Sequence, residues 1–297
     1  MIKRKIAVVG IPGKWSTEVL ADAVEASTGF RLVVDMAEVT HHLSSNQLQC
    51  AGQHLCELDA IIVKKISSEY NPNTLDRLEL LRVAESQGVK VFSGAENMLR
   101  LVNRLSCTIT LRNGNIRMPD TTITEDADAA FDAVKQYGEA VFKPLFSTKA
   151  RGMCLLSAKE SDKQLKKAIR DFQQENPMMY IQRKLNLAGQ DLGLIFLGGQ
   201  YLGAYARIAS NKETWNTTIH SGGYYAPYTP SAEIIAVAQK AQDLFNMDFT
   251  TVDVAMTDNG PVVFEVSAFG GFKGAKEGAG IDVASLYVNY VLDKLAQ

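Results

Sequence analysis

The stretch from Thr251 to Ser267 has the pattern of two strands joined by a tight turn. The turn contains Asn259-Gly260, and Asn-Gly between apolar runs is a strong signal for a β-hairpin. With the turn centred on Asn259, Asp253 and Glu265 are expected to face each other across the hairpin. Because side chains alternate along a strand, one face should be core, with Val252, Val254, Met256, Val262, Phe264 and Val266. The other face should carry the chemistry, with Asp253, Ala255, Val263, Glu265 and Ser267.

Two carboxylates directly opposite each other, about 5 Å apart, destabilise a pair of strands unless a positive charge lies between them. A divalent cation is the simplest source of that charge. Oxygen ligands without a neighbouring Cys or His favour Mg²⁺ or Mn²⁺ over zinc. The alternative is a solvated hairpin in which Asp253 and Glu265 each form a salt bridge with a Lys or Arg, since carboxylates are common on exposed strand faces.

A glycine-rich stretch follows the hairpin directly. It contains Gly270, Gly271, Gly274, Gly278 and Gly280, interleaved with Lys273, Lys276 and Glu277. A backbone with so much glycine can approach an anionic ligand closely, and the two lysines add positive charge. The pattern therefore predicts an anion-binding loop beside the carboxylate pair, and the alternative is a flexible connector to the last helix.

The composition limits the class of protein. With 297 residues, 46% of them hydrophobic, the chain can bury a substantial core, split over about two or three subdomains. A formal net charge of −2 gives no general attraction to nucleic acid or to an anionic membrane. The apolar runs are too short for a membrane span, the start lacks a signal-peptide core, and the cysteines lack zinc-ligand spacing. These features predict a soluble, cytoplasmic protein with reduced thiols.

Strand and helix patterns divide the chain into three expected domains. Residues 1–94 alternate strand and helix, which predicts a small parallel sheet covered by helices. The glycine turn after its first strand lacks the spacing of a Walker loop, and the absence of GxGxxG excludes a dehydrogenase of the dinucleotide-binding type. Residues 95–185 are expected to form a helical connector and a lobe of two helices on a short antiparallel sheet. Residues 186–297 should form a second lobe with the hairpin. The predicted fold class is α/β followed by α+β.

The loop after Lys143 is a second functional feature. Its sequence, Ser147-Thr148-Lys149-Ala150-Arg151-Gly152, combines small and hydroxyl residues with two cations, which can fold over a phosphate chain. Taken alone, the loop is better explained as a solvated charged turn. Its assignment therefore depends on the rest of the chain.

Several segments together resemble the ATP-grasp superfamily over almost the whole chain. They are Ala140 to Gly152 (AVFKPLFSTKARG), Tyr180 to Asp191 (YIQRKLNLAGQD), Trp215 to Gly223 (WNTTIHSGG), Thr251 to Ser267 and Gly280 to Ala284 (GIDVA). Within the superfamily the chain is similar to the RimK-like carboxylate–amine ligases, and in detail to the GAK-system ATP-grasp enzymes. The resemblance implies an ATP-grasp fold, in which two α+β lobes clamp Mg-ATP behind a small N-terminal α/β domain.

The resemblance also implies roles for individual residues. The implied nucleotide-binding residues are Arg104, Lys143, Ser147 and Arg151 at the phosphates, Gln182, Arg183, Lys184 and Leu185 in the hinge beside adenine, Asp191, and the triplet Asn216, Thr217 and Thr218. The implied metal ligands are Asp253, Glu265 and Ser267. Arg207 is expected to bind the substrate carboxylate bidentately, with a surface ion pair as the alternative. Lys273 and Lys276 are expected to assist at the acyl phosphate, and His220 and Ser221 to contact substrate.

Some of these positions depart from the family pattern. Arg104 and Arg183 stand where a lysine and a hinge glutamate are expected, and Ser267 stands where an asparagine would bind the metal. Ser147 and Ala150 replace two glycines of the phosphate-covering loop. An arginine keeps the charge of a lysine but not its point geometry. A serine can still coordinate a cation through its hydroxyl or through a water.

The implied function is an ATP- and Mg-dependent carboxylate–amine ligase. ATP phosphorylates a carboxylate, and an amine then displaces phosphate from the acyl phosphate to give an amide. Such chemistry requires cations at the transferred phosphoryl group and exclusion of water. The implied cofactors are ATP and Mg²⁺ or Mn²⁺, and the implied partners are an unknown carboxylate, an unknown amine and a further copy of the chain. The alternative is a nucleotide-binding regulatory or scaffold protein that keeps the clamp without the chemistry.

Overall fold

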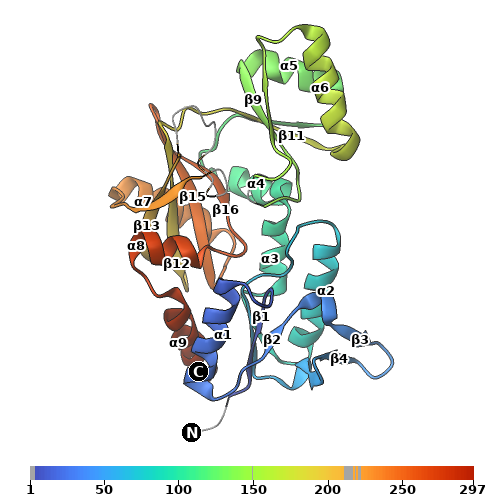
Figure 1. Ribbon diagram of the computed structural model, residues 1–297, viewed down its shortest axis with the longest axis vertical. Coiled ribbons are helices and arrows are strands. Elements are labelled where there is room, and N and C mark those ends of the chain that lie inside the picture. Colours follow the sequence, from blue (N-terminus) through green and yellow to red (C-terminus); the bar gives the residue numbers. More distant parts are fainter. Residues whose placement is uncertain (1–3, 149, 211–216, 218, 220–221) are drawn as a thin grey trace.

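The computed structural model describes residues 4–148, 150–210, 217, 219 and 222–297. Its N-terminal sheet lies at one end of the molecule and a small antiparallel sheet at the other, with the largest sheet between them (Figure 1). The three sheets fall within the three ranges expected from the sequence, and the mixed fold class is confirmed. The domain boundaries themselves stay a prediction.

The N-terminal sheet is parallel and has the order β2-β1-β6-β7. Its strands are β1 (Ile6–Val9), β2 (Val33–Val34), β6 (Ala60–Val63) and β7 (Lys90–Phe92). Alternate residues of β1 enter different cores, because Ile6 and Val8 pack with α1 (Trp15–Thr28) and Ala7 and Val9 pack with α2 (Asn73–Ser86). The sheet is thus buried on both faces, as a parallel sheet requires.

A small antiparallel sheet, β3 (Thr40–His42), β4 (Gln47–Cys50) and β5 (Gln53–His54), adds to this part and was not expected. The short 3₁₀ helices η1 (Met36–Glu38) and η2 (Leu55–Glu57) flank it along the chain. All four cysteines are free thiols, as expected.

Two connector helices lead into the central lobe: α3 (Ala95–Val102) and α4 (Arg104–Asn113). The lobe contains β8 (Thr121–Thr124), α5 (Ala127–Tyr137), β9 (Glu139–Lys143), β10 (Cys154–Ser157), α6 (Asp162–Glu175) and β11 (Met179–Arg183). Its antiparallel sheet has the order β10-β9-β11-β8. Phe142 and Ile181 pack with both helices in a separate core, which leaves Val141 and Gln182 on the opposite face, toward the rest of the molecule.

The largest sheet is antiparallel, with the order β14-β13-β12-β15-β16. Its elements are β12 (Gln190–Leu197), β13 (Gln200–Ile208), β14 (Tyr224–Pro227), α7 (Ala232–Asp243), β15 (Phe249–Thr257), β16 (Gly260–Val266), α8 (Phe272–Ala279) and α9 (Val283–Ala296). Helix α7 packs on one face and α8 on the other. As predicted, Asp253 lies directly opposite Glu265.

A bulge changes the faces of the hairpin from those expected. Val254 pairs with Val263, not with Phe264, so β16 has one extra residue between this pair and the carboxylate pair. Val263 therefore packs in the core, while Phe264 lines a cavity, the reverse of the prediction. Val262 pairs with Ala255 on the other face, and Met256 is 40% exposed, so neither shares the predicted core face.

The glycine-rich stretch is mostly helix α8, so both interpretations of it as a loop are wrong for residues 272–279. Gly274 and Gly278 lie one turn apart against the buried ring of Tyr205 on β13. A Cβ at Gly274 would come within 2.5 Å of the ring, and a Cβ at Gly278 within 2.4 Å of the Tyr205 Cβ. The glycines therefore allow a helix to lie close on the sheet.

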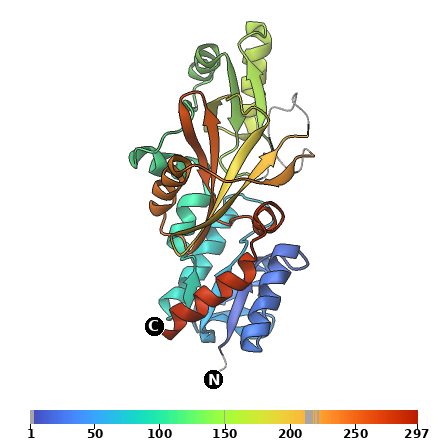
Figure 2. The ribbon, with the colours of Figure 1, turned by 90° about the vertical axis from the view of Figure 1, so that its left-hand side faces the viewer.

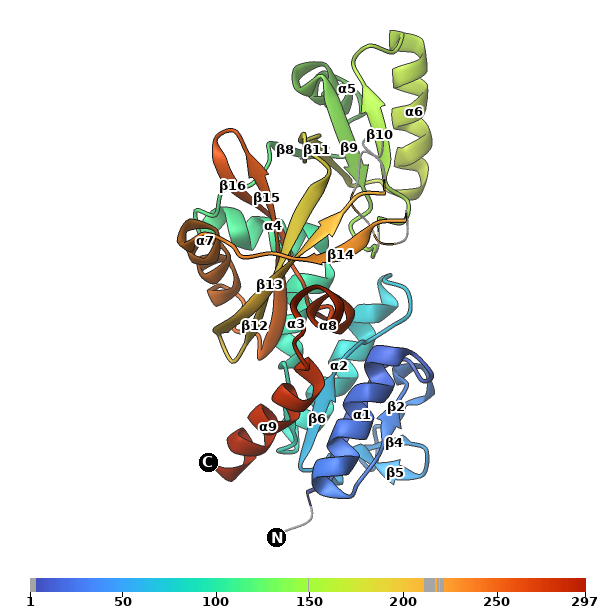
Figure 3. The ribbon, with the colours of Figure 1, turned by 60° about the vertical axis from the view of Figure 1, so that its left-hand side comes forward.

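The last helix, α9, returns to the N-terminal part and lies beside α1 (Figures 2 and 3). Tyr287, Val288 and Val291 pack in one core with Ile6 and Leu20. Within the part of the chain that the structure describes, no helix is long and apolar enough to cross a membrane.

Candidate active site

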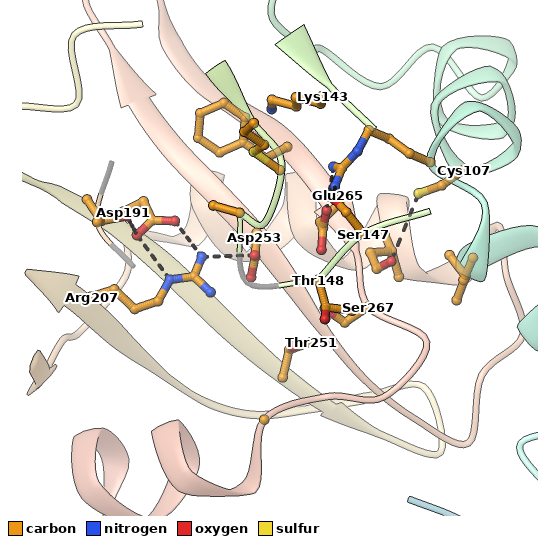
Figure 4. Close-up of a pocket in the computed structure, with 18 of the residues that line it drawn as sticks. Cys107, Lys143, Ser147, Thr148, Asp191, Arg207, Thr251, Asp253, Glu265 and Ser267 are labelled. Atoms are coloured by element: carbon orange, nitrogen blue, oxygen red, sulfur yellow. Dashed lines mark hydrogen bonds and ion pairs between the residues drawn. The ribbon is translucent and has the colours of Figure 1, made fainter. Parts of the chain in front are cut away.

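A cavity of about 450 Å³ lies where the N-terminal part, the central lobe and the largest sheet meet (Figure 4). Residues from all three parts line it, together with the connector helices. The sequence-predicted residues in its wall are Arg104, Lys143, Ser147, Gln182, Arg183, Lys184, Leu185, Asp191, Arg207, Thr217, Asp253, Glu265 and Ser267. The fold thus brings most of the predicted site residues together, although they come from segments far apart in the chain.

Other predicted residues are not in this wall. Arg151 forms an exposed ion pair with Glu69, with 3.1 Å between Nη1 and Oε1. Lys273 faces Glu277 at 3.6 Å on the exposed side of α8, and the Lys276 ammonium lies 5.3 Å from the centre of the Trp15 ring. The predicted contacts Asn216, Thr218, His220 and Ser221, and Lys149 of the covering loop, lie outside the described residues.

Arginines pair with the carboxylates of the site. Arg207 donates from Nε to Asp191 Oδ1 at 3.1 Å, forms a second short contact with the same carboxylate, and lies 2.9 Å from Asp253 Oδ2. Thr217 also donates to Asp191, at 2.6 Å. On the neighbouring strand, Glu265 Oε2 accepts from Arg104 at 3.0 Å. The structure therefore shows the arginine pairing that the alternative interpretation expected, but in a cavity wall rather than on a solvated hairpin.

Arg104 is positioned by the first turn of α4. Asn103 caps this helix, because its side-chain oxygen accepts from the backbone N–H groups of Leu105 and Ser106. The Arg104 N–H donates to Leu145 O in the central lobe, and its guanidinium reaches Pro144 O and Glu265. One side chain thus connects the two lobes across the cavity.

Asp253 has the electrostatics of a cation ligand. Burial raises the pKa of Asp253 well above its usual range, Arg207 opposes this, and the charge of Glu265 adds to it. Asp253 Oδ1 is buried and has no hydrogen-bond partner among the described residues. Such an oxygen is costly unless a ligand satisfies it.

The donor set fits a hard divalent cation. Two carboxylates and the hydroxyl of Ser267 lie together in the wall, and all three offer oxygen (Figure 4). Among the described residues, no group of three or more His, Cys, Asp or Glu side chains is placed to hold a metal. A cation here would therefore depend on the Asp253–Glu265 pair together with other oxygen atoms.

Lys143 lies at the end of β9, where its Nζ donates to Gln182 Oε1 at 2.6 Å. Its ammonium also lies 5.3 Å from the centre of the Phe264 ring, which the bulge in β16 turns into the cavity. Burial lowers the pKa of Lys143 to about 7, and the positive charge of Arg104 contributes, while Glu265 opposes. An anion beside Lys143 would restore its full charge.

The hinge comprises the last two residues of β11, Gln182 and Arg183, and the two residues that follow them. The backbone N–H groups of Arg183 and Lys184 donate to Asp120 O and Glu139 O, so they already have partners. Their side chains form ion pairs with the same residues, each at 3.1 Å. Arg183 thus has an ion-pair partner, although its side chain is 42% exposed. Leu185, the next residue in the cavity wall, lies just beyond the end of β11.

Sequence reasoning missed the wall residues from the N-terminal part and its surroundings, above all Lys65, Tyr70 and Phe269. A signal for Lys65 was present, because it directly follows a predicted buried strand of a parallel sheet. Ligands of such sheets bind outside the carboxyl ends of the strands. Phe264 was missed because no sequence pattern marks the bulge.

Comparison with known families matches residues 102–291 to the RimK-like ATP-grasp domain. The tetrahydromethanopterin:alpha-L-glutamate ligase of Methanosarcina acetivorans is 25% identical, over 94% of this chain and 96% of the relative. The probable alpha-L-glutamate ligase 2 of Pseudoalteromonas atlantica is 28% identical, over 94% of this chain and 91% of the relative.

Solved structures share the fold at lower identity. The RimK domain protein ATP-grasp from Sphaerobacter thermophilus superposes with a TM-score of 0.74 at 20% identity, covering 96% of this chain and 98% of that one. The ATP-grasp ligase PsnB, in a complex with Mg, ADP and a variant of its minimal precursor, gives a TM-score of 0.76 at 16% identity over 99% of this chain and 100% of that one.

Proposed function

This chain belongs to the RimK-like ATP-grasp family, and on that premise we propose that its cavity binds ATP with Mg²⁺ and joins a carboxylate to an amine. Members of the family are ATP-dependent ligases that form C–N bonds, and the chain is one of them. The observation that carries the proposal for this cavity is the Asp253–Glu265 pair, with its unsatisfied buried oxygen, in the same wall as Lys143.

Asp253, Glu265 and Ser267 would hold the metal. Mg²⁺, when bound, neutralises charge on the phosphoryl group being transferred. Lys143 and Arg104 would hold the phosphates from the two sides of the cavity, where Arg104 already joins the lobes. Ser147 and the loop around it would cover them and exclude water, which protects an acyl phosphate from hydrolysis. Leu185 and its neighbours would contact adenine.

Arg207 has a more constrained role than the sequence suggested. Its guanidinium holds Asp191 by two nitrogen atoms and also pairs with Asp253. A bidentate grip on a substrate carboxylate would require Arg207 to leave Asp191. We therefore propose that Arg207 orients Asp191 and Asp253, and that it can hold the substrate carboxylate with two nitrogen atoms only by giving up its contacts with Asp191.

For the substrates, the relatives named as alpha-L-glutamate ligases suggest L-glutamate as the first amine to test. We propose that the carboxylate belongs to a small molecule or to a peptide terminus, and that the chain self-associates, which light scattering tests. None of the comparisons favours a regulatory clamp without chemistry.

The proposal is tested by ADP release with Mg-ATP, L-glutamate and a panel of carboxylates. We expect Asp253→Asn and Glu265→Gln each to lower the rate by about 100-fold or more, because charge stabilisation of this kind contributes on the order of 10²–10³. Asp258→Asn, in the turn of the same hairpin, is the matched control and should keep full activity. Full turnover in both site variants would show that this hairpin does not hold the metal.

A further inference from the structure

A chain of hydrogen bonds connects Lys143 with the connector helix α4. Lys143 Nζ donates to Gln182 Oε1 at 2.6 Å, and Gln182 Nε2 lies 3.2 Å from the hydroxyl oxygen of Tyr180. That oxygen lies 3.0 Å from Thr108 Oγ1 on α4. Lys143, Gln182 and Thr108 line the cavity, whereas Tyr180 is 1% exposed and does not belong to the described wall. Tyr180 therefore connects wall residues without being one of them.

The register of the central sheet brings these side chains together. Tyr180 on β11 lies opposite Lys143 on β9, and Gln182 lies opposite Thr121 on β8. Residues two apart on a strand share a face, so Tyr180 and Gln182 point to the same side of the sheet. The contact between Lys143 and Gln182 is then a diagonal one across neighbouring strands, which long side chains can span.

The direction of each hydrogen bond follows from the partners. The Thr121 hydroxyl donates to Pro119 O at 2.9 Å, so toward Gln182 Nε2, at 3.1 Å, its oxygen can only accept. The opposite orientation of the Gln182 amide would turn its NH₂ group to the Lys143 ammonium, which has only donors. Gln182 Nε2 therefore donates to Thr121 and Tyr180, and these two acceptors keep Oε1 toward Lys143.

The Tyr180 side chain is itself held by α4 at both its hydroxyl and its ring. Burial raises the pKa of Tyr180, so the phenol keeps its proton. Since its oxygen accepts from Gln182, the proton is donated to Thr108. One helical turn before Thr108, the Arg104 guanidinium lies 5.9 Å from the centre of the Tyr180 ring. Tyr180 thus lies between the two cations proposed to hold the phosphates.

We propose that Tyr180 is a positioning residue for ATP, whose hydroxyl orients Gln182 and thereby sets the Lys143 ammonium in the cavity. This inference rests on the proposed function, since the ligand is the nucleotide of the same cavity. Without the hydroxyl, Gln182 Nε2 keeps Thr121 as one acceptor and loses the other. The amide can then turn more freely, and the ammonium loses its fixed orientation toward the phosphates.

A double-mutant cycle tests whether Tyr180 acts through Lys143. The affinity for Mg-AMPPNP is measured by calorimetry in the parent, in Tyr180→Phe, in Lys143→Met and in the double variant. Tyr180→Phe keeps the ring beside Arg104, and we expect it to bind about 3- to 10-fold more weakly, as for loss of a neutral hydrogen bond. In the Lys143→Met background the same substitution should change the affinity by less than about twofold, because the group that it positions is absent.

The same lobe offers a matched control. The Tyr137 hydroxyl lies 2.7 Å from that of Thr122, and neither residue belongs to the described wall, so Tyr137→Phe should stay within about twofold of the parent. Thr108→Val removes the acceptor of the Tyr180 proton and should weaken binding in the same direction as Tyr180→Phe. It provides the test from α4 if Tyr180→Phe does not fold.

Three results would overturn the proposal: parent-like affinity in the folded Tyr180 or Thr108 variant, an equal loss in the Lys143→Met background, or no binding of Mg-AMPPNP to the parent. An equal loss in that background would indicate a general effect on the structure. Coupling between Tyr180 and Lys143 without ADP release from any substrate pair would instead keep Tyr180 as a positioning residue and reject the ligase function.

Discussion

Individual charges in the cavity are held in pairs, and each pair limits what its members can do. Removing one partner of a buried pair typically costs about 3–5 kcal/mol, because the other charge is left uncompensated. Arg207 forms such buried pairs with Asp191 and Asp253, whereas the Arg104–Glu265 pair is worth less because the Glu265 side chain is 40% exposed. These arginines therefore stabilise the folded protein as well as facing the ligand, so substitutions of them would affect stability and activity together.

Lys143 allows a sharper test, because its pKa lies at about 7. A phosphate beside it favours the ammonium, so its pKa rises when nucleotide binds. Nucleotide affinity should therefore be highest below pH 7 and fall as the pH rises above 7, by up to about tenfold per pH unit until the pKa of the complex is reached. Calorimetry at pH 8, in two buffers with different ionisation enthalpies, should detect uptake of protons on binding of Mg-AMPPNP.

Lys143→Arg is the control for this titration. An arginine stays protonated throughout this range, so the variant should bind nucleotide with little proton uptake and a flatter pH profile. The same proton uptake in Lys143→Arg would show that another group titrates.

Among the elements, helix α8 owes its position to two glycines. In an exposed helix interior, Gly→Ala stabilises by about 0.5–1 kcal/mol. Gly278→Ala should instead destabilise the protein by about 1–3 kcal/mol, because the new methyl group meets Tyr205 and the helix must move away from the sheet. Urea denaturation measures the difference. Glu277→Ala, on the exposed side of the same helix, should change the stability by less than about 0.5 kcal/mol, and a Gly278→Ala protein more stable than the parent would contradict the packing.

The sequence predicted local features well and tertiary ones poorly. Asn259-Gly260 sets the turn, so the pairing of Asp253 with Glu265 followed from local chemistry. The bulge beside that pair depends on how β16 packs, and no residue of the turn predicts it. Helix α8 was missed for a similar reason: its glycines suit a loop by propensity, and only contact with Tyr205 explains them in a helix.

The same distinction applies to the site. Most of the cavity wall from the central lobe and the largest sheet followed from a resemblance in which motifs keep their order along the chain. Lys65 and Phe269 are far apart in sequence and meet only because the N-terminal sheet abuts the loop after β16. Arg151 and Lys273 show the converse, since both are close in sequence to wall residues and lie outside the wall.

At the scale of the whole molecule, the chain closes on itself through α9. This helix belongs by sequence to the last predicted range, 186–297, yet it completes the core of the first. The first and last elements thus lie side by side, and the largest sheet connects to the N-terminal sheet through a shared core as well as through the connector helices (Figure 3). We propose domain boundaries at residues 94 and 185. Helix α9 belongs to the last domain by sequence and packs in the core of the first.

Tyr287 tests this closure. Its side chain is 2% exposed, and its ring lies 5.5 Å from that of Phe249 on β15 while packing in the core that contains β1 and α1. Tyr287→Ala should lower the stability by about 3–5 kcal/mol, as for other large aromatic residues removed from a core. Hydrogen exchange should then quicken in β1 and α1, far from the substitution in sequence. Leu286→Ala, at a 41% exposed neighbour, should leave both quantities nearly unchanged. If exchange quickened only within α9, the helix would be an appendage, and the N-terminal sheet would be stable without it.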